Sequence, residues 1–204
     1  MKESDVSFLQ FDKRLFFAFL CVSTFALFFI RKTMIESEIA LFEVLDMEGD
    51  MGIIRILNGL EYLSIPVVFA FKFTIIATML WVASFMFGYH LTWPKLWQIA
   101  MTGHVIFLVP ELIRVVWFMI TPGDPDLREI QNFYPLSLLQ AIGYQEVNES
   151  YWYVLKRLNL FELAYWFFLG YATHKLANKN RWIAYAIITI GYVVPFLLWL
   201  WFRL

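Results

Sequence analysis

Five long, mainly apolar stretches divide this chain of 204 residues. A helix that spans a bilayer needs about 20 such residues, because the hydrocarbon core is about 30 Å thick and a helix rises about 1.5 Å per residue. The stretches cover residues 15–30, 63–89, 96–120, 158–176 and 182–202. The sequence therefore predicts an all-α membrane protein, with five transmembrane helices in a single domain.

The amino-acid composition excludes the main alternatives to a membrane fold. Hydrophobic residues make up 61% of the chain and charged residues 16%, whereas soluble domains have about half and about a quarter. The single cysteine cannot form an intrachain disulfide, and the net charge of −1 provides no basic surface for nucleic acid. We therefore expect the lipid bilayer as the surrounding solvent and no nucleic acid among the partners.

The charges between the spans predict the orientation of the chain. Lys and Arg are shared evenly between the two sets of connections, whereas acidic residues fall mainly on the long connections 31–62 and 121–157. The short connections around Lys95 and residues 175–181 are basic and contain no acidic residue, as is typical of cytoplasmic loops. We expect a cytoplasmic amino terminus, an external carboxyl terminus and a bacterial inner membrane.

The connection between the first two spans has the pattern of an amphipathic helix. Thr33 and Glu36 have the spacing of a capping box, in which each side chain satisfies a backbone N–H of the other residue. Apolar residues then recur at three- and four-residue steps, while Glu36, Glu43 and Asp46 fall on another face. We predict a short outward helix from Thr33 to Glu48 that either packs over the spans or docks a partner.

The connection between the third and fourth spans is rich in aromatic residues. It begins with a Pro-Gly-Asp-Pro turn at residues 122–125. Phe133, Tyr134 and Trp152 are too apolar for a solvated loop, and Tyr and Trp favour the headgroup region. We expect this connection to re-enter the membrane interface as short helices. The predicted partner-docking surface comprises Glu36, Glu43, Asp46, Phe133, Tyr134 and Trp152.

Two charged residues lie in the middle of the third span. Glu111 and Arg114 are three positions apart, which places them on one face of a helix within reach of an ion pair. Pro110 frees a backbone carbonyl one turn earlier. Charge at membrane depth is costly unless it is paired or hydrated. The pair is therefore either a polar centre that recognises an ion, a headgroup or a partner's charge, or a self-satisfied pair that fixes helix packing.

Further polar residues within the spans include Lys72, His104, Asn159 and Glu162. Lys72 has no acidic residue three or four positions away, so it needs a partner from another helix. Only Glu111 and Glu162 are acidic residues within the spans. We therefore predict that one of these two pairs across the bundle with Lys72 or Arg114. Glu162 and Asn159 stand near a span end and can also reach water, and His104 is either a hydrogen-bonded structural group or a proton relay.

No catalytic or metal-binding motif is visible in the sequence. The three histidines lie on separate spans or at their ends, without the spacing of metal ligands, and the single cysteine has no partner for metal binding. Serine nucleophile motifs and phosphate-binding glycine loops are also missing. We predict no metal, no cofactor and no enzymatic activity.

Two segments of the sequence resemble a known family. They are LNLFELAYW at residues 158–166, followed by Leu169-Gly170 and a basic turn, and WPKLW at residues 93–97. These segments are similar to the Yip family, five-span membrane proteins that interact with Rab GTPases, and especially to its bacterial relatives. The resemblance covers residues 60–202 and implies the five-span fold and topology. The chain lacks the long amino-terminal region and the Asp-Leu-x-Gly-Pro signature of eukaryotic members.

These observations favour a non-enzymatic accessory, assembly or organising subunit of a membrane complex. Its partner would be another integral membrane protein or a second copy of the chain. The alternative is a small transporter or channel subunit with a buried polar path. The residues of that path would be Lys72, His104, Glu111, Arg114 and Glu162. A membrane enzyme that acts on lipid is the third possibility.

Overall fold

The computed structural model describes residues 11–33, 51–121, 127–177 and 180–204. Within these ranges the regular elements are all helices. The first half consists of α1 (Lys13–Arg31), α3 (Met51–Met86), α4 (Trp93–Gly103), the 3₁₀ turn η4 (His104–Phe107) and α5 (Leu108–Ile120). The second half consists of α6 (Leu127–Asn132), α7 (Leu138–Ile142), η5 (Tyr144–Glu146), α8 (Glu149–Arg157), α9 (Leu160–Ala177), α10 (Arg181–Ile188), the π-helical turn η6 (Thr189–Val193) and α11 (Val194–Trp201). The predicted all-α class is confirmed for the described residues.

Four helical segments are long and apolar enough to cross a membrane, which supports an integral membrane protein. They are Lys13–Arg31, Gly59–Met86, Trp93–Ile120 and Arg181–Trp201. These segments coincide with the first, second, third and fifth predicted spans. The fourth predicted span corresponds to α9, which carries Glu162 in its first turn and His174 and Lys175 in its last. The predicted amphipathic helix lies outside the described residues apart from Thr33.

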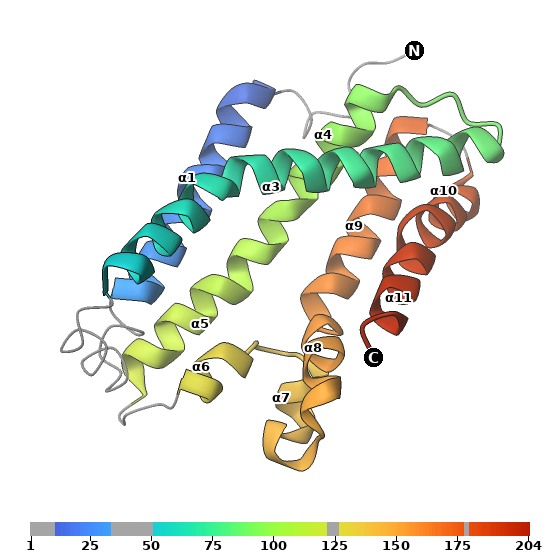
Figure 1. The fold of residues 1–204 in the computed structure, drawn as a ribbon. Coiled ribbons are helices and arrows are strands. Elements are labelled where there is room, and N and C mark those ends of the chain that lie inside the picture. The colour runs from blue at the N-terminus through green and yellow to red at the C-terminus, as the bar shows by residue number, and fades with distance from the viewer. Residues whose placement is uncertain (1–10, 34–50, 122–126, 178–179) are drawn as a thin grey trace.

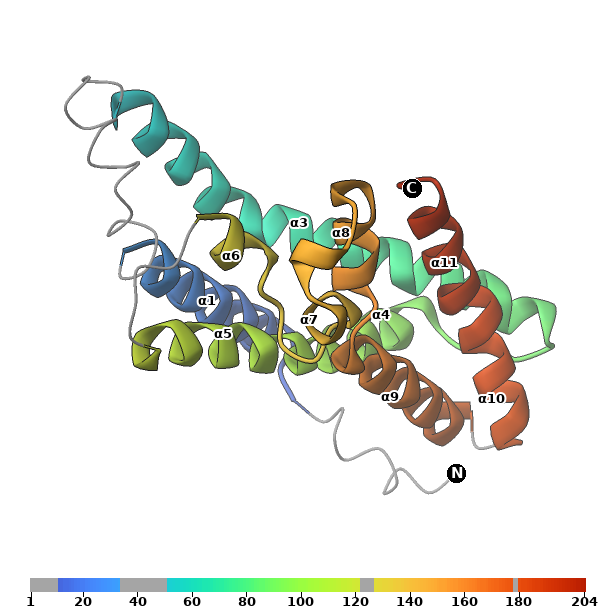
Figure 2. The ribbon, with the colours of Figure 1, turned by 90° about the horizontal axis from the view of Figure 1, so that it is seen from below.

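The helices form a bundle that α3 crosses obliquely (Figure 1). α1, α4 and α10 begin at one end of the bundle, uppermost in Figure 1, whereas α5 and α11 finish toward the opposite end. α9 runs back toward the first end and packs against α10 and α4. The short helices α6, α7 and α8 gather where α5 finishes and α9 begins (Figure 2).

Two of the spans change helix type shortly before a proline. The 3₁₀ turn η4 precedes Pro110, and the π-helical turn η6 precedes Pro195. Proline has no N–H to donate, and its ring displaces the carbonyl four residues earlier, so the preceding turn changes its hydrogen bonding. Both spans continue beyond the irregular turn, and η4 brings His104 into the interior of the bundle.

A closely packed core occupies the part of the bundle around α4. The fully buried side chains there include Phe73, Leu96, Ile99, Met101 and Tyr165. The Tyr165 hydroxyl donates to the carbonyl of Ala100 at 3.2 Å, so its polar atom is satisfied inside the apolar core. The ring of Phe73 also packs edge-on to His104 at 5.2 Å between ring centres. This core closes the bundle on the α4 side of His104.

Backbone hydrogen bonds attach the connection that follows α6 to the start of α9. The N–H of Leu138 donates to the carbonyl of Leu158 at 3.0 Å, and the N–H of Leu160 donates to that of Leu136 at 3.1 Å. Leu136 has a φ of 57°, a left-handed conformation that non-glycine residues adopt at a cost. The strained turn at Leu136 therefore forms part of the junction between α8 and α9.

Candidate functional site

A polar cavity of about 280 Å³ lies between the second half of α1, the middle of α3, the start of α5 and the junction of α8 with α9. Its polar lining consists of Thr24, Arg31, Lys72, His104, Glu111, Tyr134, Arg157 and Glu162. Apolar side chains, among them Phe69, Phe107 and Leu108, complete the wall. We refer to this space as the polar cavity. It brings together four of the predicted centre residues, Lys72, His104, Glu111 and Glu162.

Glu111 occupies the first turn of α5 and joins two arginines. Its Oε2 atom lies 3.7 Å from Nη1 of Arg31 on α1 and 3.8 Å from Nη1 of Arg114 on α5. The second contact is the i, i+3 pair that the spacing predicts. The first contact ties the end of α1 to α5. The sequence does not indicate it, because a cation at the end of a span is usually only a flanking residue.

Two cations hold the short helix α6 against the bundle. The buried Arg114 side chain donates from Nη2 to the carbonyl of Ile130, and the Lys156 ammonium donates to that of Gln131. Both carbonyls belong to the last turn of α6, where helix carbonyls lack intrahelical partners and carry partial negative charge. Burial and the charge of Arg114 lower the pKa of Lys156 to about 8. Arg114 and Lys156 thus serve the structure of the connection.

Glu162 is buried in the first turn of α9 and accepts two side-chain hydrogen bonds. Its Oε1 atom accepts from the Tyr192 hydroxyl at 2.8 Å and from Nε1 of Trp166 at 3.0 Å. Asn159 caps the same helix, because its Oδ1 accepts from the N–H of Glu162 at 2.8 Å. Its Nδ2 donates to the carbonyls of Lys156 and Arg157. Asn159 therefore fixes the angle between α8 and α9 rather than lining the polar cavity.

Several polar groups of the cavity have no hydrogen-bond partner within the described residues. Nδ1 of His104 and Oγ1 of Thr24 are both buried without a partner. The Lys72 ammonium lies 4.9 Å from the centre of the Phe107 ring, and within the described ranges it has no ion pair. The Arg157 guanidinium stacks over a tyrosine ring and likewise has no carboxylate partner in the described part of the chain.

The cavity has more hydrogen-bond donors than open acceptors. Three cationic and two acidic side chains line it. The Glu111 carboxylate is already shared by two arginines, and one oxygen of Glu162 already accepts two hydrogen bonds. Burial and the charge of Glu111 raise the pKa of Tyr134, so its phenol stays a donor near neutral pH. The arrangement favours a ligand that accepts hydrogen bonds and carries negative charge.

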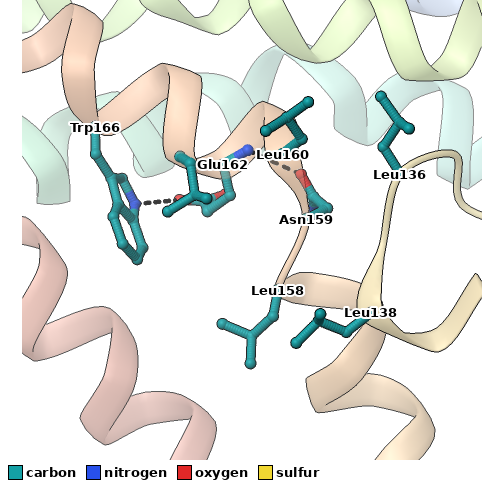
Figure 3. A pocket seen from close by; sticks show the side chains of 8 residues that line it. Leu136, Leu138, Leu158, Asn159, Leu160, Glu162 and Trp166 are labelled. Atoms are coloured by element: carbon teal, nitrogen blue, oxygen red, sulfur yellow. Dashed lines mark hydrogen bonds between the residues drawn. The ribbon is translucent and has the colours of Figure 1, made fainter. Parts of the chain in front are cut away.

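A second, apolar pocket of about 340 Å³ adjoins the start of α9 (Figure 3). Its lining consists of Leu136, Leu138, Leu158, Asn159, Leu160, Glu162, Leu163 and Trp166. Figure 3 shows the leucine side chains around an open space, with the Glu162 carboxylate hydrogen-bonded to Trp166. We refer to this space as the leucine pocket. Glu162 belongs to the walls of both the leucine pocket and the polar cavity.

Among the described residues, neither Lys72 nor Arg114 forms the predicted ion pair across the bundle, although the charges of Lys72 and Glu162 attract each other over a longer distance. The ion pair between helices is formed by Glu111 on α5 and Arg31 on α1. Arg114 also pairs with Glu111, but from the same helix. Lys72 faces an aromatic ring instead. Sequence reasoning missed Arg31, Arg157 and Thr24 as cavity residues. The only signals for them were the basic character of Arg31 and Arg157 near span ends and the polar character of Thr24 inside the first span.

Residues of the predicted docking surface have other neighbours in the structure. Phe133 is buried, and its ring packs on Trp117 and Phe118 of α5 at 5.6 and 5.2 Å between ring centres. Tyr134 lines the polar cavity, and Nε1 of Trp152 donates to the carbonyl of Val147. Glu36, Glu43 and Asp46 lie outside the described residues, so their role stays a prediction.

In the part of the chain that the structure describes, no group of three His, Cys, Asp or Glu side chains is placed to hold a metal ion. The lining of the polar cavity provides charged and hydrogen-bonding side chains for a ligand. Comparison with protein-family models, with curated proteins and with solved structures found no match. The resemblance to the Yip family therefore stays a prediction from the sequence.

Proposed function

We propose that this chain is a five-span membrane protein that binds a polar ligand in the polar cavity, as a small transporter or as the binding subunit of one. The observation that carries this proposal is the Lys72 ammonium, which has no carboxylate within ion-pair distance among the described residues and interacts with Glu162 only across the cavity. An unpaired charge at membrane depth is costly and marks functional sites in membrane proteins. A ligand that binds there would supply the missing partner.

Five membrane crossings require that α9 spans the bilayer. The charged residues and the histidine of this helix lie at its two ends. Glu162 lies in the first turn, and His174 and Lys175 lie in the last. Polar residues at helix ends can reach the membrane interface, so they are compatible with a span of 18 residues. α9 also packs along α10 and runs toward the end of the bundle where α4 begins. With the amino terminus in the cytoplasm, the polar cavity then faces outward in a bacterial inner membrane.

Labelling of single cysteines tests this topology. In a Cys21→Ser background, we place one cysteine at Lys95, Glu149 or Arg181 and treat intact cells with an impermeant maleimide. The five-span arrangement predicts labelling of Glu149→Cys alone, and labelling of the other two only after permeabilisation. Glu149 and Arg181 flank α9, so labelling of both from the same side would show that α9 does not cross the membrane.

The polar cavity favours a ligand-binding function over the role of an accessory subunit. Three of the six docking residues in that hypothesis, Phe133, Tyr134 and Trp152, contact the chain's own helices and backbone, and the other three lie outside the described residues. A continuous pore is also less well supported, because the closely packed core around Phe73 and Leu96 lies on the α4 side of the cavity. A site of this kind fits a transporter that opens to one side at a time.

Native mass spectrometry tests whether a ligand occupies the cavity. We compare the wild-type chain, purified in mild detergent from its host membrane, with a Lys72→Met, Arg157→Gln double variant. The control is Lys13→Met with Arg14→Gln, since these residues are exposed at the start of α1. We expect a bound molecule on the wild type and on the control, and its loss from the cavity variant. Absence from the wild type, or retention by all three, would contradict the proposal.

A further inference from the structure

We infer that the ligand is an amphiphile with a phosphate-type oxyanion, whose headgroup occupies the polar cavity and whose hydrocarbon chain occupies the leucine pocket. This inference rests on the proposed function, because it names the class of ligand that the cavity binds. The inference is based on two adjoining pockets, one polar and one apolar, that share Glu162 as a lining residue. Their volumes of about 280 and 340 Å³ are each near the lower limit of ligand pockets.

The charges in the polar cavity select an oxyanion for the headgroup. Within the described ranges Lys72 and Arg157 have no carboxylate at ion-pair distance, and Tyr134 adds a neutral hydroxyl. Arginine matches a phosphate through two parallel hydrogen bonds, and lysine binds it as a point charge. The buried Oγ1 of Thr24 and Nδ1 of His104 provide two further polar atoms that have no partner within the described residues. A headgroup without a phosphate would use fewer of these groups.

The position of the leucine pocket selects a ligand from the bilayer. Leu136, Leu138, Leu160 and Leu163 line the pocket and are 42–58% exposed at the surface of the chain. In the five-span arrangement these leucines lie at the membrane interface beside the start of α9, so an acyl chain can enter the pocket sideways from the membrane. A free phosphate would leave the pocket without a ligand group. The strained φ of Leu136 lies in this wall, as is common where a binding site constrains the backbone.

Glu162 sets the boundary between the two parts of the ligand site. Its Oε1 atom is held by Tyr192 and Trp166, and the Trp166 ring forms part of the leucine pocket. Its second oxygen accepts no hydrogen bond from the described residues. A carboxylate at this position repels a phosphate from the leucine pocket and leaves the cationic side of the cavity as its binding place. The headgroup is therefore oriented toward Lys72 and Arg157.

Lipid retention in mixed micelles tests the inference. Wild-type chain is equilibrated with equal amounts of phosphatidylglycerol and of diacylglycerol, which has the same acyl chains and no phosphate, and the bound lipid is quantified by native mass spectrometry. We expect about a tenfold preference for phosphatidylglycerol, which the Lys72→Met, Arg157→Gln variant loses. Lys72→Arg retains the charge and should retain the preference. Equal retention of the two lipids by the wild type would overturn the oxyanion assignment.

A second arm separates a lipid from a free oxyanion. Leu163→Trp fills the leucine pocket, and Leu112→Trp is the matched control on the exposed face of α5. We expect Leu163→Trp to lower phosphatidylglycerol retention about tenfold and Leu112→Trp to leave it unchanged, with equal melting temperatures as the check on folding. If Leu163→Trp leaves phosphatidylglycerol retention unchanged while inorganic phosphate still displaces the lipid, the amphiphile is overturned and the binding function stands. If the wild type carries no ligand of any kind, the proposed function itself fails.

Discussion

The Glu111 carboxylate lies 3.7 Å from the Arg31 guanidinium, so an acid on α5 is paired with a cation at the end of α1. The same oxygen lies 3.8 Å from Arg114 on its own helix. Arg114 in turn donates to the carbonyl of Ile130 in α6. One carboxylate therefore connects the end of the first span, the third span and the connection that contains α6. These are the elements that form one side of the polar cavity.

Removing the charge of Glu111 should loosen this side of the bundle. We expect Glu111→Gln to lower the free energy of unfolding by about 1–3 kcal/mol, because two arginines lose their shared partner and the site is only partly exposed. Glu61→Gln is the control, since the Glu61 side chain is 51% exposed and pairs with Lys32 at 2.5 Å. Its loss should be below about 1 kcal/mol. Thermal unfolding in detergent measures both variants, and an equal loss would mean that Glu111 contributes only as a surface pair.

Lys72 should reduce stability in the ligand-free protein. Its ammonium has no carboxylate within ion-pair distance in the described part of the chain and interacts with Glu162 only across the cavity, so Lys72→Met removes a weakly compensated charge and keeps most of the side-chain volume. We expect a gain of about 1–3 kcal/mol in the free energy of unfolding, as is common when a binding residue is replaced. The exposed Lys95→Met should change stability by less than about 0.5 kcal/mol. A loss of stability in Lys72→Met would assign this residue a structural role instead.

Helical periodicity and apolar length were sufficient to predict four of the spans, because both are local properties of the sequence. The Glu111–Arg114 pair was predictable for the same reason, since its geometry is set by one helix. The pairing of Glu111 with Arg31 depends on how α1 lies against α5, and many helix arrangements share the same hydropathy pattern. The inward position of Phe133 likewise depends on the path of the connection after α6. The residues that line the polar cavity could therefore be predicted only in part from the sequence.

The hydrogen bond between Glu162 and Tyr192 should couple α9 to η6 energetically. A double-mutant cycle with Glu162→Gln and Tyr192→Phe isolates this bond, whose donor and acceptor atoms are 2.8 Å apart. We expect a coupling energy of about 1 kcal/mol, because a bond to a carboxylate is stronger than one to an amide. Tyr89→Phe is the matched control, since its hydroxyl donates to the carbonyl of Asn180 rather than to Glu162. Additive losses for both tyrosines would show that the bond contributes nothing measurable.

Lys156 should make the stability of the protein depend on pH in the alkaline range. Its pKa is about 8 in the folded chain, against 10.5 for an unperturbed lysine. The folded state therefore releases this proton first, so stability rises as the pH increases from about 8 to about 10.5 and the penalty is complete below that window. One pKa unit corresponds to about 1.4 kcal/mol, which sets an upper limit of about 3 kcal/mol.

The variant Lys156→Gln tests this dependence. Compared with the wild type, its melting temperature should rise less between about pH 7 and about pH 9.5, because the titrating group is gone. The exposed Lys95→Gln should keep the wild-type slope. Parallel slopes in the wild type and Lys156→Gln would show that burial of Lys156 does not destabilise the folded state.

Close packing at η6 should make Gly191 intolerant of a side chain. A Cβ atom at Gly191 would lie 2.9 Å from the Cβ of Ala83 and 3.1 Å from the carbonyl oxygen of Met79, both on α3. Backbone atoms cannot move away as a flexible side chain can, so we expect Gly191→Ala to cost about 1–3 kcal/mol. Gly59→Ala is the control, because nothing lies within 4 Å of its Cβ position in α3, and a helical alanine should add about 0.5–1 kcal/mol. Adding Ala83→Gly should restore part of the loss by removing the nearest contact, and a Gly191→Ala variant as stable as Gly59→Ala would mean that α3 and η6 do not approach this closely.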